Sequence, residues 1–322
     1  ITALLVLIGL LQLTIRFLLD LLFPTLFEVN GFLFFYLTFS TLLSIALPTV
    51  LYLKNEGKPY FCNVWEDIRP NRLLLLTALL GIVCQFAGMA LNLPVISAIT
   101  KWVGPVSNRV PEITTFGELI LGIAVMGLLP AVCEEILFRG VILNAFREYG
   151  TKCAVVFSAL MFAVLHMDVT NFVGPFVMGI VFGKMAVKTN RLIYPMIAHF
   201  CVNTTATVLT YALQSDVFSD FYNDFILIVM LAALAAIVPL TSLFGKQSEK
   251  KELKCYTDYK EKVTEIHDGQ NSIRIIEHDI KENNFKLALQ ALLKKPSFYL
   301  LVALFLMVGG SIYYSYKNNH RF

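Results

Sequence analysis

Carboxylate, imidazole and amide side chains recur at four-residue spacing within otherwise apolar stretches of this sequence. They form three motifs: Glu134-Glu135-x-x-x-Arg139, Phe162-x-x-x-His166 and His199-x-x-x-Asn203. A charged residue near the centre of a membrane helix costs roughly 2.5 to 3.5 kcal/mol, so such a cluster indicates a function that offsets this cost. Acids, imidazoles and an amide placed together inside a membrane make catalysis the leading candidate.

A spacing of four residues places two side chains on one face of a helix, about one turn apart. Glu135 and Arg139 meet this condition, so we expect them to neutralise one another and to have a structural role. Glu134 lies about 100° around the helix from Glu135, so we expect it to point elsewhere and to be free for chemistry. We interpret Asp168, which closely follows His166, as a solvated loop residue.

The three motifs can lie at the same depth in a membrane. With a rise of about 1.5 Å per residue, Glu134 lies about 20 Å from a helix end near Arg147. His166 lies about 20 Å from the start of its own apolar run at residue 153, and the third motif lies roughly 10 to 17 Å into its helix. One shared cavity is therefore expected. Pro130, one turn before Glu134, removes a backbone hydrogen bond and can kink the helix at this site.

Composition and hydropathy place these motifs in a membrane protein. Apolar residues make up 57% of the chain, the mean hydropathy is +0.68, and runs of about 20 apolar residues recur. We predict an all-α, polytopic helical transmembrane bundle with about nine spans. The predicted spans are 1–23, 31–53, 73–93, 117–138, 153–166, 172–187, 192–213, 224–244 and 297–315.

Lysine and arginine alternate between successive loops, as the positive-inside rule requires of a multi-pass protein of the cell membrane. Loops 54–72, 139–152 and 184–191 each contain several of these residues and are predicted to be cytoplasmic. Loops 24–30, 167–171 and 214–223 contain none and are predicted to be external, as is 94–116, which has only Lys101 and Arg109. The N-terminus is then cytoplasmic and the C-terminus external. The net charge of +3 reflects this topology and gives no reason to expect nucleic-acid binding.

The chain divides into three predicted parts: a transmembrane bundle over 1–245, a cytoplasmic segment over 246–296, and an additional C-terminal transmembrane helix within 297–322. The cytoplasmic segment has eleven basic and nine acidic residues. We interpret it as a solvated tether that ends in an amphipathic surface helix, with docking of a partner protein as the alternative. Because all the polar motifs precede residue 204, the tail is expected to be dispensable for the chemistry.

The three motifs resemble those of the CPBP family, the CAAX prenyl-protease and bacteriocin-processing (Abi) group of intramembrane proteases. The resemblance rests on Glu134-Glu-Ile-Leu-Phe-Arg-Gly140, Phe162-Ala-Val-Leu-His166 and Tyr194-Pro-Met-Ile-Ala-His-Phe-Cys-Val-Asn203. Any one motif is weak, but three in this order on separate spans are specific. In detail the resemblance covers about residues 73–213.

The resemblance implies an intramembrane endopeptidase in which Glu134 is the general base that activates a water. His166, His199 and Asn203 would orient that water and stabilise the oxyanion, while Glu135, Arg139 and Phe162 would support the site. Zinc held by Glu134, His166 and His199 is the alternative. The sequence has no HExxH helix, so we favour a mechanism without a metal cofactor.

The implied substrates are membrane-associated proteins or peptides in the lipid bilayer. Two classes of alternative function stay open at this point. One is a non-proteolytic membrane scaffold or immunity protein that uses the polar cluster for packing or partner binding. The other is a transporter with a proton-relay carboxylate. The six cysteines show no CxxC pair and predict neither a disulfide framework nor a thiolate metal site.

Overall fold

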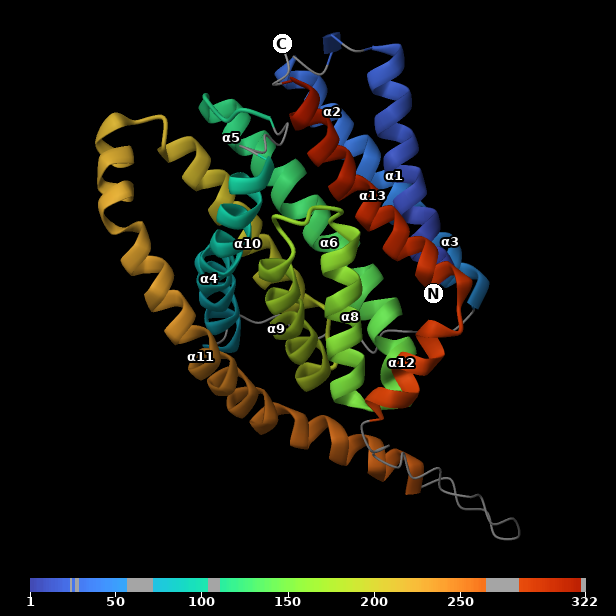
Figure 1. Cartoon of the computed structure of the whole chain (residues 1–322). Coiled ribbons are helices and arrows are strands. Elements are labelled where there is room, and N and C mark those ends of the chain that lie inside the picture. Colours follow the sequence, from blue (N-terminus) through green and yellow to red (C-terminus); the bar gives the residue numbers. More distant parts are fainter. Residues whose placement is uncertain (24, 27–28, 57–71, 104–110, 265–283, 320–322) are drawn as a thin grey trace.

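The computed structural model describes residues 1–23, 25–26, 29–56, 72–103, 111–264 and 284–319. All regular secondary structure in these ranges is helical, as predicted, and the helices form one bundle (Figure 1). Lys58, Arg69 and Arg109, which were used to predict topology, lie outside the described residues, as does the central part of the predicted tether, 265–283.

Each of the nine predicted spans coincides with helix. The first half of the chain forms α1 (Thr2–Leu22), α2 (Asn30–Ser40), η2 (Thr41–Ala46), α3 (Leu47–Glu56), α4 (Arg72–Val103), α5 (Phe116–Gly122), η3 (Ile123–Leu128), α6 (Leu129–Glu135), η4 (Ile136–Ile142), α7 (Leu143–Phe146) and η5 (Arg147–Tyr149). The second half forms α8 (Thr151–Leu165), α9 (Val173–Thr189), α10 (Ile193–Ala212), α11 (Asp216–Thr264), α12 (Phe285–Leu293) and α13 (Pro296–Asn319).

The helices define a multi-pass membrane protein. Among the described residues, five helical segments are long and apolar enough to cross a bilayer: Thr2–Leu22, Asn30–Asn55, Arg72–Trp102, Phe116–Tyr149 and Asp216–Ser248. A sixth results if Phe285–Leu293 and Pro296–Val308, which meet at an angle of 82°, are taken as one broken span. The helices α8, α9 and α10, which match the three other predicted spans, are not among these candidates.

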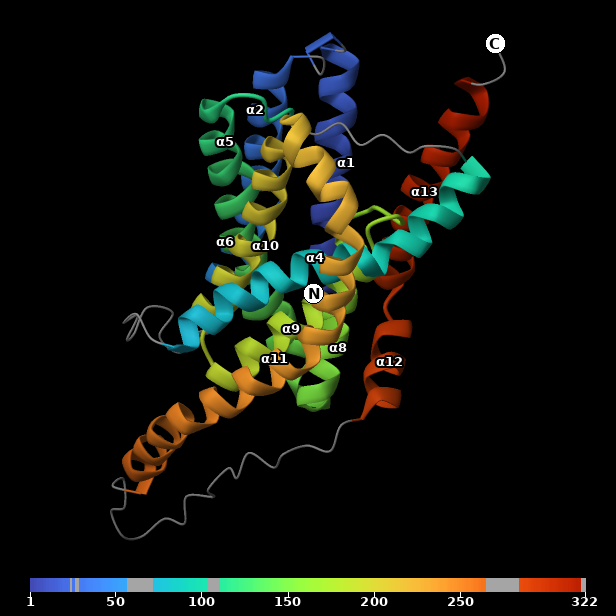
Figure 2. The same ribbon diagram turned by 90° about the vertical axis from the view of Figure 1, so that its left-hand side faces the viewer.

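The helices α8 and α9 form a short hairpin inside the bundle. The turn between them lies well below the upper ends of α1 and α10 (Figures 1 and 2). We had predicted an external loop for 167–171, but this turn is not at that end of the bundle. The reason is length, since α8 has 15 residues and is shorter than its neighbours. His166 therefore lies at a turn within the bundle.

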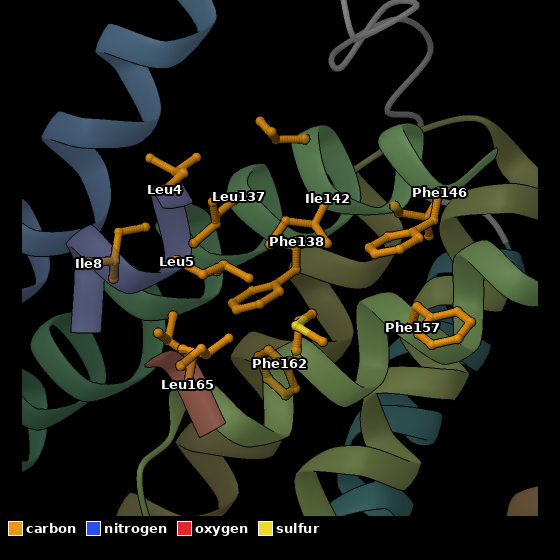
Figure 3. Close-up of a cluster of buried hydrophobic side chains, with 14 of the residues drawn as sticks. Leu4, Leu5, Ile8, Leu137, Phe138, Ile142, Phe146, Phe157, Phe162 and Leu165 are labelled. Carbon is orange, nitrogen blue, oxygen red and sulfur yellow. The ribbon is translucent and has the colours of Figure 1, made fainter. Parts of the chain in front are cut away.

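The main hydrophobic core packs α1, η4, α8 and α13 around the first two motifs. Leu5 and Ile8 of α1 point toward Leu137 and Phe138, and Phe162 lies below them (Figure 3). All five side chains are buried. A second core joins α4, α9, α10 and α11 on the other side of the motifs. The polar motifs are thus enclosed between two apolar cores that fix the helices that carry them.

The helix that carries the acidic motif is continuous from Phe116 to Tyr149, as predicted for its extension beyond Arg139. It contains two π-helical stretches, η3 and η4, which flank the short α-helical stretch α6. The helix does not break at Pro130. Instead, Pro130 occupies the first turn of α6, immediately after η3, where its missing N–H is tolerated. Single π turns within α-helices are frequent at functional sites.

The C-terminal helices pack on the bundle. Leu301 and Leu304 of α13 are buried in the main core with Leu5 and Ile8, and Phe305 contacts Phe172 just after the α8–α9 turn. The side chain of Ala288 on α12 is also buried there. The packing of the tail into the main core shows that it is part of the folded bundle, which the positions of the motifs along the chain could not reveal. That the tail is dispensable for the chemistry stays a prediction.

The boundary predicted at residue 245 is not marked by any break in secondary structure. The helix α11 passes through it and continues to Thr264. After the residues that the structure does not describe, Asn284 caps the N-terminus of α12, and its side chain accepts a hydrogen bond from the N–H of Leu287. The backbone N–H of Asn284 also donates to the carbonyl of Tyr149 at 3.0 Å. The chain therefore returns to the bundle at the end of the helix that carries the acidic motif.

Candidate active site

Two adjacent carboxylates converge on one imidazole. The Nδ1 atom of His199 lies 2.8 Å from Oε1 of Glu135. On the other side of the ring, Nε2 of His199 lies 4.0 Å from Oε2 of Glu134. An ionised carboxylate can only accept hydrogen bonds, so Nδ1 of His199 carries the proton and donates. This contact leaves Nε2 of His199 facing Glu134.

Glu134 and Glu135 point into different surroundings, as the angle of about 100° between them predicted. Both nevertheless approach His199, from opposite sides of its ring. The side chain of Glu135 is fully buried, whereas that of Glu134 is 17% exposed. Glu135 is thus enclosed by protein, and Glu134 is the carboxylate that a ligand can reach.

The predicted ion pair between Glu135 and Arg139 is present. The Nη1 atom of Arg139 donates to Oε1 of Glu135 at 2.9 Å, and both side chains are fully buried. The Nη2 atom donates to the carbonyl of Gly179 on α9 at 3.2 Å. Among the described residues, Glu135 Oε2 and Arg139 Nε have no hydrogen-bond partner. The pair therefore links α6 and η4 to α9 and, through Glu135, to His199 on α10.

Aromatic rings surround this ion pair. The guanidinium carbon of Arg139 lies 4.7 Å from the ring centre of Phe162 and 5.4 Å from that of Phe182. Cation–π contacts of this kind stabilise an arginine that is removed from water. The Phe162 ring also meets the rings of His166 and His199 edge to face, with centres 4.7 and 5.7 Å apart. Phe162 thus contacts the basic side chains of all three motifs.

His166 occupies the position just after α8 ends, and its side chain is exposed. Its Nδ1 atom lies 2.8 Å from the carbonyl oxygen of Phe162. A carbonyl can only accept, so Nδ1 of His166 carries the proton and Nε2 is left for another partner. Both imidazoles are thus held in the same way, through an Nδ1 donor, with Nε2 available for chemistry.

Asn203 is held by the π-helical stretch η3. Its Nδ2 atom donates to the carbonyl of Met126 at 2.9 Å. An amide nitrogen has two protons, so one remains for a ligand after this contact. The close approach of α10 to α4 fixes the other side of this helix, because a Cβ at Gly81 would collide with the carbonyl of Ala198. Contacts with η3 and with α4 therefore fix two sides of α10, the helix that carries His199 and Asn203.

A set of hydrogen bonds fixes the turn that follows His166. The buried side chain of Asn92 on α4 donates to Oδ1 of Asn171 at 2.7 Å and accepts from the N–H of Gly174 at 2.8 Å. Asp168 accepts from the N–H and the hydroxyl of Thr170 at 2.8 and 2.6 Å. Asp168 is therefore half-buried and has a structural role, and our interpretation of it as a solvated loop residue is wrong.

Sequence reasoning missed Asn92. An amide side chain in the apolar span 73–93 indicates that it pairs with polar groups of another segment, here the α8–α9 turn.

Substitution of Asn92→Leu is expected to lower the free energy of unfolding by about 1 to 3 kcal/mol, because it leaves the Gly174 N–H and the Asn171 amide unpaired. Asn171→Ala removes only one of the two contacts, so it should cost less. Thermal unfolding in detergent measures both. Equal stability of parent and Asn92→Leu would contradict this structural role.

Two cavities open beside these residues. A smaller one of about 300 Å³ is lined by Glu134 and His166 together with residues of α1, α2 and η2. A larger one of about 670 Å³ is lined by His166, His199 and Asn203 together with residues of α4, α9 and α11. The predicted catalytic residues therefore surround space that a ligand can enter.

Metal binding and cysteine chemistry find little support in the arrangement of side chains. Within the described ranges, no three histidine, cysteine, aspartate or glutamate side chains are grouped closely enough to hold a metal ion. Cys84, Cys133, Cys153 and Cys201 are all free thiols, and two of them, Cys84 and Cys153, are buried. None of these four lines either cavity.

The fold and the site together define a class: a multi-pass helical membrane protein with carboxylate, imidazole and amide groups around two cavities inside its bundle. Comparison with known families then identifies the domain. Residues 116–205 match the family described as type II CAAX prenyl endopeptidase Rce1-like. The chain thus carries an Rce1-like domain of the CPBP family, and this domain contains all three motifs.

Two curated proteins are similar to parts of this chain. A Bacillus subtilis (strain 168) protein named "Putative membrane peptidase YdiL" is 28% identical over 90 residues, which cover 28% of this chain and 37% of that protein. An Escherichia coli protein named "Uncharacterized 24.3 kDa protein" is 25% identical over 164 residues, 49% of this chain and 66% of that protein. The chain therefore spans less than two thirds of either relative. No solved structure matches the chain.

Proposed function

We propose that this protein is an intramembrane endopeptidase that hydrolyses peptide bonds of membrane-associated proteins or peptides with a water activated by Glu134. The observation that carries the proposal is the position of His199 between the two carboxylates, Glu135 at 2.8 Å and Glu134 at 4.0 Å. The buried Glu135 fixes the ring, while the accessible Glu134 lines a cavity together with His166. Family membership of residues 116–205 supports the same activity.

In the proposed reaction, Glu134 takes a proton from a water that Nε2 of His166 orients by accepting a hydrogen bond. The water oxygen then attacks the scissile carbonyl carbon. The free amide proton of Asn203 faces the oxyanion that develops, while Nε2 of His199, which has no proton in this tautomer, accepts a hydrogen bond from the water on the side of Glu134. Preorganised donors of this type are most effective where little water is present, as in a cavity within an apolar bundle. The proton held by Glu134 passes to the leaving amine.

The remaining motif residues would position these groups. Glu135 holds His199 in one tautomer, Arg139 neutralises Glu135, and Phe162 packs against both imidazoles. Such positioning matters because displacing a catalytic group by about 1 Å can lower the reaction rate roughly 100-fold. These three residues touch no reacting atom in the proposed reaction, so their substitution should act through the geometry of His199 and His166.

We propose that the reaction needs no metal. The proposal rests on the sequence, which has no HExxH helix of the kind that holds zinc in many metalloproteases. Activity is therefore expected to survive EDTA and phenanthroline, and the purified active protein is expected to contain well under one zinc per chain by elemental analysis. Loss of activity together with stoichiometric zinc, and its return when zinc is added, would instead assign Glu134, His166 and His199 as zinc ligands.

We further propose that all nine predicted helices cross or enter the membrane, with the N-terminus in the cytoplasm and the C-terminus outside. The segment 246–296 then lies on the cytoplasmic side, where it could bind a partner protein. In a background without native cysteines, Gln214→Cys should react with an impermeant thiol reagent from outside intact cells, and Gln247→Cys should not. The reverse pattern of labelling would invert the topology and the side of substrate entry.

The direct test is hydrolysis of a peptide library by the purified full-length protein in lipid vesicles. Mass spectrometry would identify the products and the cleaved bonds. Endoproteolysis predicts internal cleavage at defined bonds that depends on Glu134. If no peptide is cleaved although the protein is folded, a non-proteolytic membrane scaffold becomes the better account of the site.

A further inference from the structure

Among the residues that the structure describes, His166 is the one that lines both cavities. Glu134 lines the smaller cavity but not the larger one, whereas His199 and Asn203 line the larger cavity but not the smaller one. The proposed base and the proposed oxyanion donor, Asn203, therefore face different spaces. This division raises the question of which cavity receives the peptide, a question that rests on the proposed function.

The volumes and linings of the cavities differ in a way that bears on this question. The larger cavity, at about 670 Å³, has more than twice the volume of the smaller one, at about 300 Å³. It combines amide side chains from α4, α10 and the α8–α9 turn with apolar side chains. The amides are Gln85, Asn92, Asn171 and Asn203, and the apolar residues include Met89, Leu93, Met178 and Met230.

Such a lining fits a peptide in an extended conformation. A peptide bond must leave a helix before it can be hydrolysed, and its N–H and C=O groups then need new partners where water is scarce. An amide side chain can donate to a backbone carbonyl and accept from a backbone N–H at once. The apolar residues of the same cavity would meanwhile contact apolar side chains of the substrate.

Gln85 is the lining residue with unused capacity for this purpose. Asn92 and Asn171 bond to one another, and Asn203 bonds to Met126. In the part of the chain that the structure describes, the half-buried amide of Gln85 has no hydrogen-bond partner, although it lies on α4 among apolar residues. Its donor and acceptor groups can therefore pair with a ligand in this cavity without breaking an existing bond.

We propose that the larger cavity is the peptide-binding site and that Gln85 binds the substrate backbone on one side of the scissile bond. The substrate class is then an extended peptide segment with apolar side chains, held by its backbone amides. The carbonyl to be attacked would lie beside Asn203 and His199 in this cavity. Glu134 and the water that it activates would approach from the smaller cavity, past His166.

The test compares two matched variants by steady-state kinetics on a peptide that the parent protein cleaves. Gln85→Met nearly keeps the side-chain volume and removes only the hydrogen bonds, so KM should rise about five- to tenfold while kcat stays within about twofold. Gln12→Met makes the same change on α1 in the smaller cavity and should leave KM unchanged. Thermal unfolding checks that both variants fold.

A second measurement shows whether Gln85 meets the peptide backbone. Peptides in which one backbone amide at a time is replaced by an ester lack that N–H donor. For the ester at the position that meets Gln85, the KM penalty of Gln85→Met should be smaller than for the all-amide peptide, as a double-mutant cycle requires of two groups in contact. A KM penalty of Gln85→Met that is the same for every ester peptide would overturn backbone recognition.

The outcomes separate this inference from the proposed function. If the parent cleaves peptides but Gln85→Met has an unchanged KM, or Gln12→Met raises KM, the larger cavity is not the peptide site and the inference is wrong. If the parent cleaves no peptide, the proposed function itself fails. Binding of a labelled apolar peptide to Glu134→Gln, weakened by Gln85→Met but not by Gln12→Met, would support the site in the absence of turnover.

Discussion

Replacement of Glu134 by glutamine is expected to lower kcat on a membrane peptide by about 10²- to 10⁴-fold, the usual contribution of a general base. The amide keeps the shape of the side chain but cannot take a proton from water. The fold should be retained, because Glu134 is partly exposed and Nε2 of His199 is 4.0 Å from its carboxylate, beyond hydrogen-bond distance. Single-turnover kinetics in lipid vesicles, with thermal unfolding of the same preparation, measure both quantities.

Glu148→Gln is the matched control for this change. Glu148 is an exposed glutamate at the end of the same long helix, and it lines neither cavity. The control variant should cleave the peptide at the parental rate. If Glu134→Gln also retained a rate within about tenfold of the parent, Glu134 could not be the general base, and the water would have to be activated by another group.

Replacement of Arg139 by leucine is expected to destabilise the protein by about 3 to 5 kcal/mol, because it leaves Glu135 buried without its counter-charge. It also removes the contact with Gly179 that ties α9 to this helix. The double variant Glu135→Leu/Arg139→Leu leaves no unpaired charge and should recover much of the lost stability. It should stay inactive, since His199 then lacks the acceptor for Nδ1.

Reversible unfolding in mixed micelles would provide the free energies, and peptide hydrolysis the activities. Recovery of stability without recovery of activity would separate the two roles of Glu135, charge compensation and orientation of His199. If Arg139→Leu alone were as stable as the parent, the buried pair would not stabilise the bundle. If the double variant were active, Glu135 would not be needed to position His199.

Sequence alone was sufficient for the parts of the site that depend on one helix. Four-residue spacing correctly predicted the ion pair between Glu135 and Arg139, because neighbours on one helical face are set by backbone geometry. The contact of His199 with Glu135 could not be predicted in this way. It depends on how closely α10 approaches and how it is rotated, which are set by packing at positions such as Gly81.

Hydropathy located helices at all nine predicted spans but could not show how each lies in the bundle. The 15 residues of α8 are apolar, yet the helix ends at a turn among its neighbours, where Asn92 and Asp168 satisfy the polar groups. An apolar run alone does not distinguish such a hairpin from a full crossing. The packing of α13 into the main core was equally hidden, since contacts between distant segments leave no local pattern.

The pairing of the first and last helices has a consequence for the order of synthesis. The hydroxyls of Thr2 and Ser297 lie 2.6 Å apart although 295 positions separate them, and α1 and α13 share one core with Phe162. During translation, α1 therefore enters the membrane long before the helix that it packs against exists. The main hydrophobic core, which contains residues of both helices, can be completed only after α13 has been synthesised and inserted. For an enzyme that hydrolyses neighbouring membrane peptides, this delay would withhold activity while the nascent chain is still at the insertion machinery.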